Sequence, residues 1–323
     1  MFLELDNPVF EGFYTDSDNC YRYHSTVPMF PVCIHFDKPA QVRQLDENFY
    51  YPLRIIGGKH LEPSRYPWQA VLLIYDVNGQ AMLCGGTVLD DYWILTAAHC
   101  VSGRSETIYI LTGVRSLQNP RKTSKATHVY VHPAYDSFSI TNDIALLKSS
   151  KKLLDDVVKP ICLTRNDDAF LAPGTTSIVT GFGLRFQNLT SPVLTLSNSI
   201  MATEVPIISH SSCLSSWDSA TAGLIRISNK EVCAGSLLHG TSPGDSGGPL
   251  LVVDSLGRDV QIGITSFGAG GLRGVVDQNT FPGVYTRVSK YVPWIESVTT
   301  SEGSARNVFS VIVFIYLSLI CIN

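Results

Sequence analysis

Residues 244–250 read Gly-Asp-Ser-Gly-Gly-Pro-Leu (GDSGGPL), and this stretch decides how the rest of the chain is interpreted. Glycine and proline are the strongest local breakers of regular structure, so the simplest interpretation is a tight turn. The stretch also offers one hydroxyl, that of Ser246, as a nucleophile. A serine hydroxyl is weak until a neighbouring base removes its proton, and that base needs a third group to orient it.

Two further segments supply a base and an acid. Thr96–Cys100 (TAAHC) contains His99, and Asn142–Leu147 (NDIALL) contains Asp143. Asp143 leads an apolar strand, where an unpaired carboxylate is costly. Burial next to an imidazole removes that cost, which favours a pair of His99 and Asp143.

The composition limits the function classes. The chain has 323 residues, of which 45% are hydrophobic and 16% charged, with a formal net charge of −4. This is a globular composition, long enough for one large core or two smaller ones. The small charge and the lack of a long Lys/Arg run argue against a nucleic-acid partner. The 8 cysteines show no Cys-x-x-Cys spacing, which favours disulfides in an oxidising compartment over a zinc site.

The two ends of the chain carry no catalytic pattern. Residues 1–19 are acidic and lack an apolar core, so they do not resemble a secretory signal peptide; the start lies upstream or export takes another route. Val308–Ile322 (VFSVIVFIYLSLICI) is an apolar run that spans about 22 Å as a helix, less than the roughly 30 Å core of a bilayer. Three interpretations stay open for it: a removable glycolipid-anchor signal, a short membrane span, and a tail without a role.

Residues 55–299 contain many short β-branched and aromatic runs separated by Gly, Pro and Asn. This density of strands predicts an all-β sandwich or barrel. One helix is expected near the end, where Ser289 would cap a segment with Val292, Ile295 and Val298 on one side. The predicted strands are Ala70–Tyr75, Tyr109–Leu111, Ile144–Leu147, Ser177–Thr180, Pro249–Val253, Ile262–Phe267 and Val284–Val288.

TAAHC, NDIALL and GDSGGP, in this order, resemble the His, Asp and Ser segments of the chymotrypsin-like (trypsin-fold) serine proteases. The resemblance runs from Ile55 to about Val298 and includes the motifs Cys84-Gly85-Gly86, Gly181-Phe182-Gly183 and Pro282-Gly283-Val284-Tyr285. It implies an all-β fold of two antiparallel six-stranded β-barrels with a C-terminal helix and the active site between the barrels. Residues 1–54 are then an N-terminal extension or propeptide, 55–299 the peptidase domain, and 300–323 a linker with the hydrophobic tail.

The resemblance assigns a role to each residue of the constellation. Ser246 attacks the scissile carbonyl, His99 acts as general base and then general acid, and Asp143 orients the imidazole. The backbone N–H groups of Gly244 and Ser246 form the oxyanion hole. The competing function is that of a catalytically silent homologue that acts by binding.

Arg54-Ile55-Ile56-Gly57-Gly58 resembles the site at which a zymogen of this family is cleaved. Cleavage after Arg54 frees the α-amino group of Ile55, which in the family pairs with the Asp beside the nucleophile, here Asp245. Without that cation a buried Asp245 is uncompensated, and the loop that carries the oxyanion hole stays disordered.

The resemblance also implies a disulfide pattern, with the pairs Cys84–Cys100 and Cys213–Cys233. Cys162 matches the cysteine that tethers the propeptide, with Cys20 or Cys33 as its partner. Two bridges that are common in the family are missing. Ser242 and Gly271 stand where the bridge that braces the specificity pocket would be, and Ser177 and Val252 stand where the other would be.

The substrate-binding positions implied by the resemblance are Gly240, Ser266, Phe267, Gly268 and Gly283. Trypsin-like members have an Asp at the position of Gly240, so a buried substrate cation would be unpaired here. Because Gly268 and Gly283 match the wall glycines of open pockets, we expect a preference for large apolar or aromatic side chains. On the long segment 269–282, Asp277 would instead favour basic substrates and Arg273 acidic ones.

No cofactor or metal is expected, because Leu111–Pro120 lacks the acidic ligands that a calcium site needs. Asn188-Leu189-Thr190 is an acceptor triplet for a glycan in a secreted protein. The expected partners are protein or peptide substrates, an activating trypsin-like protease and protein inhibitors, with membrane attachment through the tail as an option. The expected location is extracellular, either secreted or attached to the outer cell surface.

Overall fold

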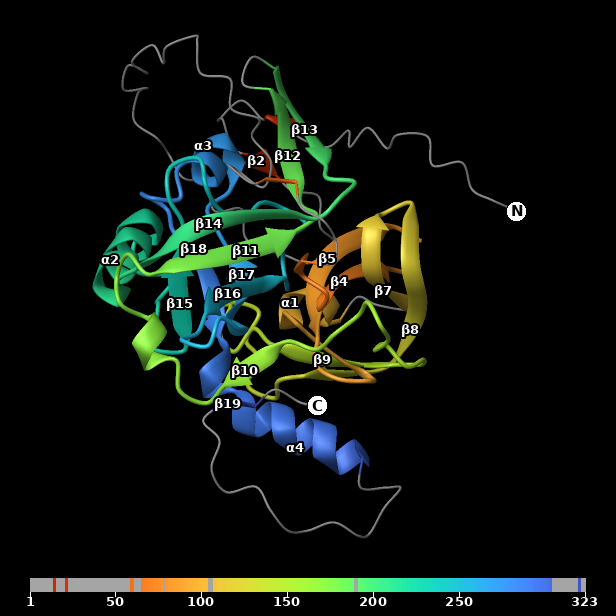
Figure 1. The fold of residues 1–323 in the computed structure, drawn as a ribbon. Helices are drawn as coiled ribbons and strands as arrows, with labels where there is room; N and C mark the ends of the chain where they lie inside the picture. Colours follow the sequence, from red (N-terminus) through yellow and green to blue (C-terminus); the bar gives the residue numbers. More distant parts are fainter. Residues whose placement is uncertain are drawn as a thin grey trace.

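The computed structural model describes residues 14–15, 21–22, 59–60, 65–77, 79–103, 107–188, 191–303 and 319–320. Arg54, Ile55, Cys20, Cys33 and most of the apolar tail lie outside these described residues. Within them, two six-stranded β-barrels lie beside each other (Figure 1). The expected all-β double barrel is therefore confirmed.

The first barrel, orange to yellow in Figure 1, is a closed antiparallel ring in the order β4-β5-β6-β9-β8-β7. Its core is made by apolar runs such as Val71–Ile74, whereas β8 carries mostly polar side chains toward solvent. Its strands are β4 (Gln69–Tyr75), β5 (Ala81–Val88), β6 (Trp93–Thr96), β7 (Thr107–Ser116), β8 (Asn119–Val131) and β9 (Ala145–Ser149).

The second barrel runs in the order β16-β11-β14-β15-β18-β17 and is closed by the pairing of β16 with β17. Val179, Leu250 and Ile262 are fully buried in its own core. Its strands are β11 (Thr176–Gly181), β14 (Met201–Ile208), β15 (Glu231–Ala234), β16 (Pro249–Val253), β17 (Asp259–Phe267) and β18 (Gly283–Arg287).

Short strands extend the second barrel. β3 (Lys59–His60) pairs with β14, β10 (Cys162–Thr164) lies parallel to β17, and β19 (Leu319–Ile320) pairs with β10. Two separate hairpins are formed by β12 (Leu184–Asn188) with β13 (Ser191–Leu196) and by β1 (Tyr14–Thr15) with β2 (Tyr21–Arg22).

The helices of the described residues are α1 (Ala98–Val101), α2 (His210–Thr221), α3 (Gly271–Val276) and α4 (Val292–Gly303), with 3-10 turns at η2 (Asp168–Phe170) and η3 (Val288–Lys290). The sequence predicted only the last of these helices. α2 was missed because its serine-rich sequence has no apolar stripe; Ser209 caps it by accepting a hydrogen bond from Ser212 N at 3.1 Å. None of the described helices is long and apolar enough to cross a membrane.

The expected cap of the C-terminal helix at Ser289 is wrong. α4 begins at Val292, and Ser289 lies in η3, where its hydroxyl donates to Asp167 Oδ1 at 2.9 Å. Because the Ser289 hydroxyl is hydrogen-bonded to the buried carboxylate of Asp167, it does not cap the N-terminus of α4. The predicted face is confirmed, because Val292 and Ile295 are buried in the core cluster that contains the first barrel.

The two barrels meet closely beside the GDSGGPL stretch. Gly85 N of the first barrel donates to Ser246 O of the second at 2.7 Å. A Cβ atom at Gly85 would lie 2.8 Å from Gly248 Cα, so only glycine permits this approach. The loop that carries Ser246 is thereby fixed against the barrel that carries His99.

Candidate active site

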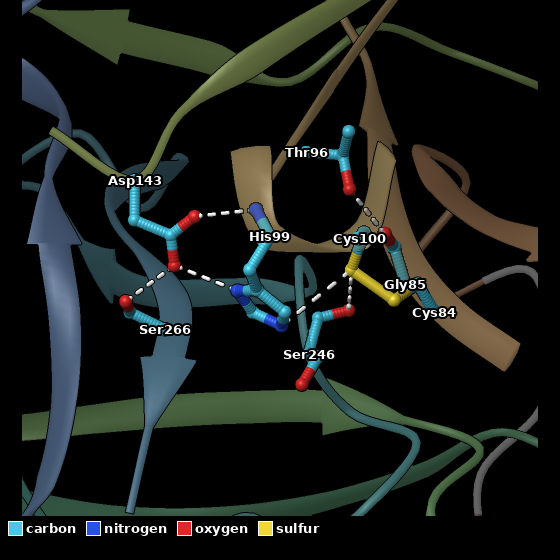
Figure 2. The surroundings of a disulfide bond; sticks show 8 residues. All are labelled: Cys84, Gly85, Thr96, His99, Cys100, Asp143, Ser246 and Ser266. Carbon is cyan, nitrogen blue, oxygen red and sulfur yellow. Dashed lines mark hydrogen bonds and ion pairs between the residues drawn. A yellow bond between two sulfur atoms is a disulfide. The ribbon is translucent and has the colours of Figure 1, made fainter. Parts of the chain in front are cut away.

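The three expected active-site residues come from three separate segments. His99 lies in α1, directly after the first-barrel strand β6; Asp143 precedes β9; and Ser246 lies in the loop that leads to β16. Figure 2 shows His99 between Asp143 and Ser246. The imidazole is partly accessible, with 22% of the His99 side chain exposed, whereas the Asp143 side chain is fully buried.

Asp143 is held by hydrogen bonds from two sides. Its Oδ1 accepts from His99 N at 2.8 Å, and its Oδ2 lies 2.7 Å from His99 Nδ1. Ser266 Oγ, at the end of β17, donates to the same Oδ2 at 2.5 Å. The backbone carbonyl of Asp143 also accepts from Thr286 Oγ1 of β18 at 2.8 Å. The second barrel thus fixes an acid that belongs to the first.

The charge state of Asp143 determines the tautomer of His99. Burial would raise the pKa of this carboxyl, but the imidazole of His99 and the hydrogen bond from Ser266 hold the pKa below its ordinary value. An ionised carboxylate can only accept, so His99 Nδ1 carries the proton. In the neutral ring Nε2 is then the acceptor nitrogen, which is the form that a general base requires.

The loop before β16 presents two backbone amides. Gly244 has a φ of +98°, a conformation that L side chains rarely adopt. Among the described residues, neither Gly244 N–H nor Ser246 N–H donates a hydrogen bond to the backbone. Neither amide is therefore occupied by a backbone carbonyl of the described residues. Pro243, beside them, is exposed, and its carbonyl accepts from Leu184 N at 2.8 Å.

Asp245, next to Ser246, is also buried, at 1% exposure. Its carboxylate accepts from Gly183 N at 2.8 Å and from Ser242 N at 2.9 Å. A Cβ atom at Gly181 would lie 2.1 Å from Asp245 Oδ1, which explains a glycine of the Gly-Phe-Gly motif. Burial raises the pKa of Asp245 to about 6, despite the hydrogen bonds from Ser242 and Gly183. Within the part of the chain that the structure describes, no cation contributes to this pKa, so these residues compensate the buried carboxylate only in part.

The structure contains the two disulfides that the resemblance implies, Cys84–Cys100 and Cys213–Cys233. Cys162 is also disulfide-bonded, and its partner lies outside the described residues. Among the described residues, one group of potential metal ligands lies close together: Cys84, His99 and Cys100. Two of its three atoms are disulfide sulfurs, which are not thiolate ligands, so the donor set does not suit a metal ion.

The expected substrate-binding positions lie at the end of β17, at the start of β18 and at Gly240, in the loop before Ser246. Gly240 is buried, Ser266 and Phe267 end β17, Gly268 follows them in an exposed position, and Gly283 begins β18. The ring of Phe267 packs edge-on against Trp217 of α2, with centroids 5.1 Å apart.

The segment 269–282 contributes a residue that the sequence analysis missed, Gln278. It is 4% exposed and packs against Gly240 and Gly283. The two charged candidates on this segment have other contacts. Asp277 Oδ1 accepts from Thr280 N at 3.1 Å, and the Arg273 guanidinium lies 5.7 Å from the centroid of the Phe281 ring. The sequence offered one indication of this contact: Gly240 and Gly283 have no side chains, which leaves room for a side chain from the segment 269–282.

Comparison with known proteins agrees with the fold. The family model described as Trypsin matches residues 55–295. The chain therefore belongs to the trypsin family of serine proteases. It is 30% identical to the clotting factor G beta subunit of Tachypleus tridentatus over 271 residues, covering 80% of this chain and 84% of that protein. It is 33% identical to human (Homo sapiens) kallikrein-8 over 258 residues, covering 77% of this chain and 88% of that protein.

Proposed function

We propose that the chain is a serine endopeptidase that cleaves peptide bonds through Ser246, His99 and Asp143. The observation that carries this proposal is the hydrogen-bonded pair of a buried, ionised Asp143 and the His99 ring, with Ser246 on the other side of that ring (Figure 2). A structural histidine would not need an acid that is bonded to both its ring and its backbone N–H.

In the proposed reaction, His99 Nε2 removes the proton of Ser246 Oγ as that oxygen attacks the substrate carbonyl carbon. The carbonyl oxygen becomes an oxyanion, and the N–H groups of Gly244 and Ser246 donate to it. One such donor is worth about 3 to 4 kcal/mol. His99 then protonates the departing amine, which leaves an acyl-enzyme. Water, activated by the same imidazole, releases the second product and restores the Ser246 hydroxyl.

Activation is proposed to occur by cleavage after Arg54, by a trypsin-like protease. The freed α-amino group of Ile55 would supply the cation that Asp245 lacks. The strand order supports this, because Met201 of β14 pairs with His60 of β3 on one side and with Gly181 of β11 on the other. Two strand spacings separate β3 from the neighbourhood of Asp245, about 10 Å. Ile55 lies five positions before His60, a reach of about 17 Å in extended chain.

The proposed specificity is non-tryptic. Gly240 brings no charge, and the carboxamide packed against it is neutral, so a substrate Arg or Lys would have no acidic partner there. The preference for a large apolar or aromatic side chain stays a prediction, as does basic specificity through Asp277.

Protein substrates and an oxidising, extracellular setting fit the family and the disulfides. Inhibition by proteins, a glycan at Asn188 and attachment through residues 308–322 remain predictions.

The proposal is tested by cutting the purified chain after Arg54 and incubating it with a mixed peptide library. We expect cleavage of peptides by the cut protein and none by the cut Ser246→Ala variant, which keeps the rest of the site. A cut, folded wild-type chain that cleaves no peptide would instead support the silent homologue that acts by binding.

A further inference from the structure

A buried side chain fills the space over Gly240. A Cβ atom added to Gly240 would lie 1.8 Å from Gln278 Oε1 and 2.6 Å from Gln278 Nε2. These separations are far inside van der Waals contact. Gly240 therefore lacks a side chain because the carboxamide of Gln278, reaching over from the segment after α3, takes its place. The uncharged position at Gly240 is not bare but covered by a neutral polar group.

The Gln278 carboxamide is fixed by hydrogen bonds to the loop opposite. Its Nε2 donates to Thr241 O at 2.6 Å and, more weakly, to Val275 O at 3.4 Å. Its Oε1 accepts from Thr241 N at 3.3 Å. These contacts use both N–H bonds and one lone pair, so Oε1 keeps a lone pair for another donor. They also join the two segments that carry Ser242 and Gly271, where many family members have a disulfide.

A second polar group stands close by. The Tyr285 side chain is fully buried and, among the described residues, its hydroxyl has no partner in hydrogen-bond geometry, although the side chain of Thr241 is near enough to act on the pKa of the phenol and lower it. Burial raises the pKa of this phenol, so its O–H remains a donor. A buried hydroxyl without a partner destabilises the folded chain, so a ligand that pairs with it gains affinity. The hydroxyl and Gln278 Oε1 both lie 3.2 Å from the place of a Cβ atom at Gly283.

We propose that Gln278 and Tyr285 select a substrate side chain that ends in a carboxamide, so that cleavage follows Gln or Asn. This rests on the proposed function, in which Gly240 and Gly283 line the pocket for the residue before the scissile bond. The substrate N–H donates to Gln278 Oε1, and its C=O accepts from the Tyr285 O–H. Both unused hydrogen-bonding positions are then filled by one neutral group.

Other side chains match these two groups less well. An Arg or Lys offers donors only and leaves its charge without a partner. A carboxylate offers acceptors only and places its charge against the Gln278 Oε1 lone pair. An apolar or aromatic end leaves the Tyr285 hydroxyl unpaired, and sites built for hydrogen bonding discriminate strongly against ligands that lack the matching group. The preference expected from glycine positions alone thus changes from apolar to amide.

The test begins with wild-type chain cut after Arg54, with its active sites titrated by a fluorophosphonate. Peptides that differ only in the residue before the scissile bond are then compared: Gln, Asn, Phe, Tyr, Arg and Glu. We expect kcat/KM for the better amide peptide to exceed those of the Phe and Arg peptides at least about 10-fold.

Variants separate Gln278 from the rest of the pocket. Gln278→Leu should lower the ratio of Gln to Phe cleavage by about 10-fold, and Gln278→Glu should raise cleavage after Arg by a similar factor because it adds a carboxylate. The matched control is Asn279→Ala, at the exposed neighbouring position, which should leave the ratios unchanged.

The outcomes distinguish this inference from the function it rests on. A wild-type chain that reacts with the fluorophosphonate but prefers Phe, Tyr, Arg or Glu refutes the amide preference alone. An unchanged ratio in folded Gln278→Leu refutes the role of Gln278. A wild-type chain that does not react refutes the proposed function and this inference with it. If the Gln278 variants do not fold, the wild-type ratios decide.

Discussion

Two aspartates of the site, Asp143 and Asp245, are each about 1% exposed, yet their pKa values shift in opposite directions. Burial raises both, but Asp143 has the His99 ring and its pKa ends below the ordinary value. Among the described residues, Asp245 accepts hydrogen bonds only from uncharged groups, and its pKa rises to about 6. Asp143 has an imidazole hydrogen-bonded to it in the folded chain, whereas the partner that we propose for Asp245, the Ile55 α-amino group, forms only on cleavage after Arg54. The comparison separates a pair of residues that is already formed from a pair that the proposed cleavage after Arg54 would complete.

The largest effect is expected where the assembled pair is broken. Asp143→Asn places an amide N–H opposite His99 Nδ1, which forces the ring proton to Nε2 and removes the base. In proteases with this triad such a change lowers kcat about 10⁴-fold. Steady-state hydrolysis of the best library peptide measures it, with exposed Asp156→Asn as the control. A loss of less than about 10-fold would mean that Asp143 does not set the tautomer.

The next largest effect is expected when cleavage after Arg54 is blocked, so that the proposed partner of Asp245, the Ile55 α-amino group, is not formed. Arg54→Gln should give a full-length chain whose activity after protease treatment stays about 10³-fold below that of cut wild type, since a misplaced oxyanion donor costs about 10² to 10³. Hydrolysis is measured before and after treatment, and intact length is checked by mass spectrometry. Wild-type-like activity from uncut chain would remove the proposed switch.

In the uncut chain, the buried carboxyl of Asp245 should also make the free energy of unfolding depend on pH. The pKa of Asp245 is about 6 in the folded chain and near the ordinary value of an aspartate, 3.8, in the unfolded chain. Between pH 4 and 6 the folded state therefore binds more protons, so this group makes stability fall as pH rises, by up to about 3 kcal/mol. Denaturant unfolding of wild type and Asp245→Asn across this range measures the difference. Parallel curves would show that the pKa of Asp245 does not rise on folding, and a wild type that gains stability over Asp245→Asn as pH rises would show that Asp245 is already paired with a cation.

The smallest effect is expected when the hydrogen bond from Ser266 to Asp143 is removed. Ser266→Ala removes the 2.5 Å hydrogen bond to Asp143 Oδ2 but leaves both bonds to His99. We expect kcat to fall by about 10-fold or less, and the acid limb of the pH–rate profile to move to higher pH because an Asp143 carboxylate with one hydrogen bond fewer attracts the proton on His99 more strongly. Exposed Ser255→Ala is the control. An unmoved acid limb would assign Ser266 a packing role only.

The sequence was sufficient to predict those parts of the fold and the site that depend on short motifs with fixed residue types. TAAHC, NDIALL and GDSGGP predicted the double barrel and brought His99 and Asp143 together. It was insufficient where contacts join distant loops. Nothing local to Gln278 shows that its amide covers Gly240, 38 positions earlier. The cap at Ser289 failed for the same reason, because Asp167, far away in sequence, takes its hydroxyl.

The most direct test of the central claim is covalent labelling by a fluorophosphonate before and after cleavage at Arg54, with the modified residue located by mass spectrometry. The label reports a working base and oxyanion hole together, independent of substrate preference. Our account predicts labelling of Ser246 in the cut chain and at most trace labelling in the uncut chain. A cut, folded chain that stays unlabelled, or a label on another residue, would contradict it.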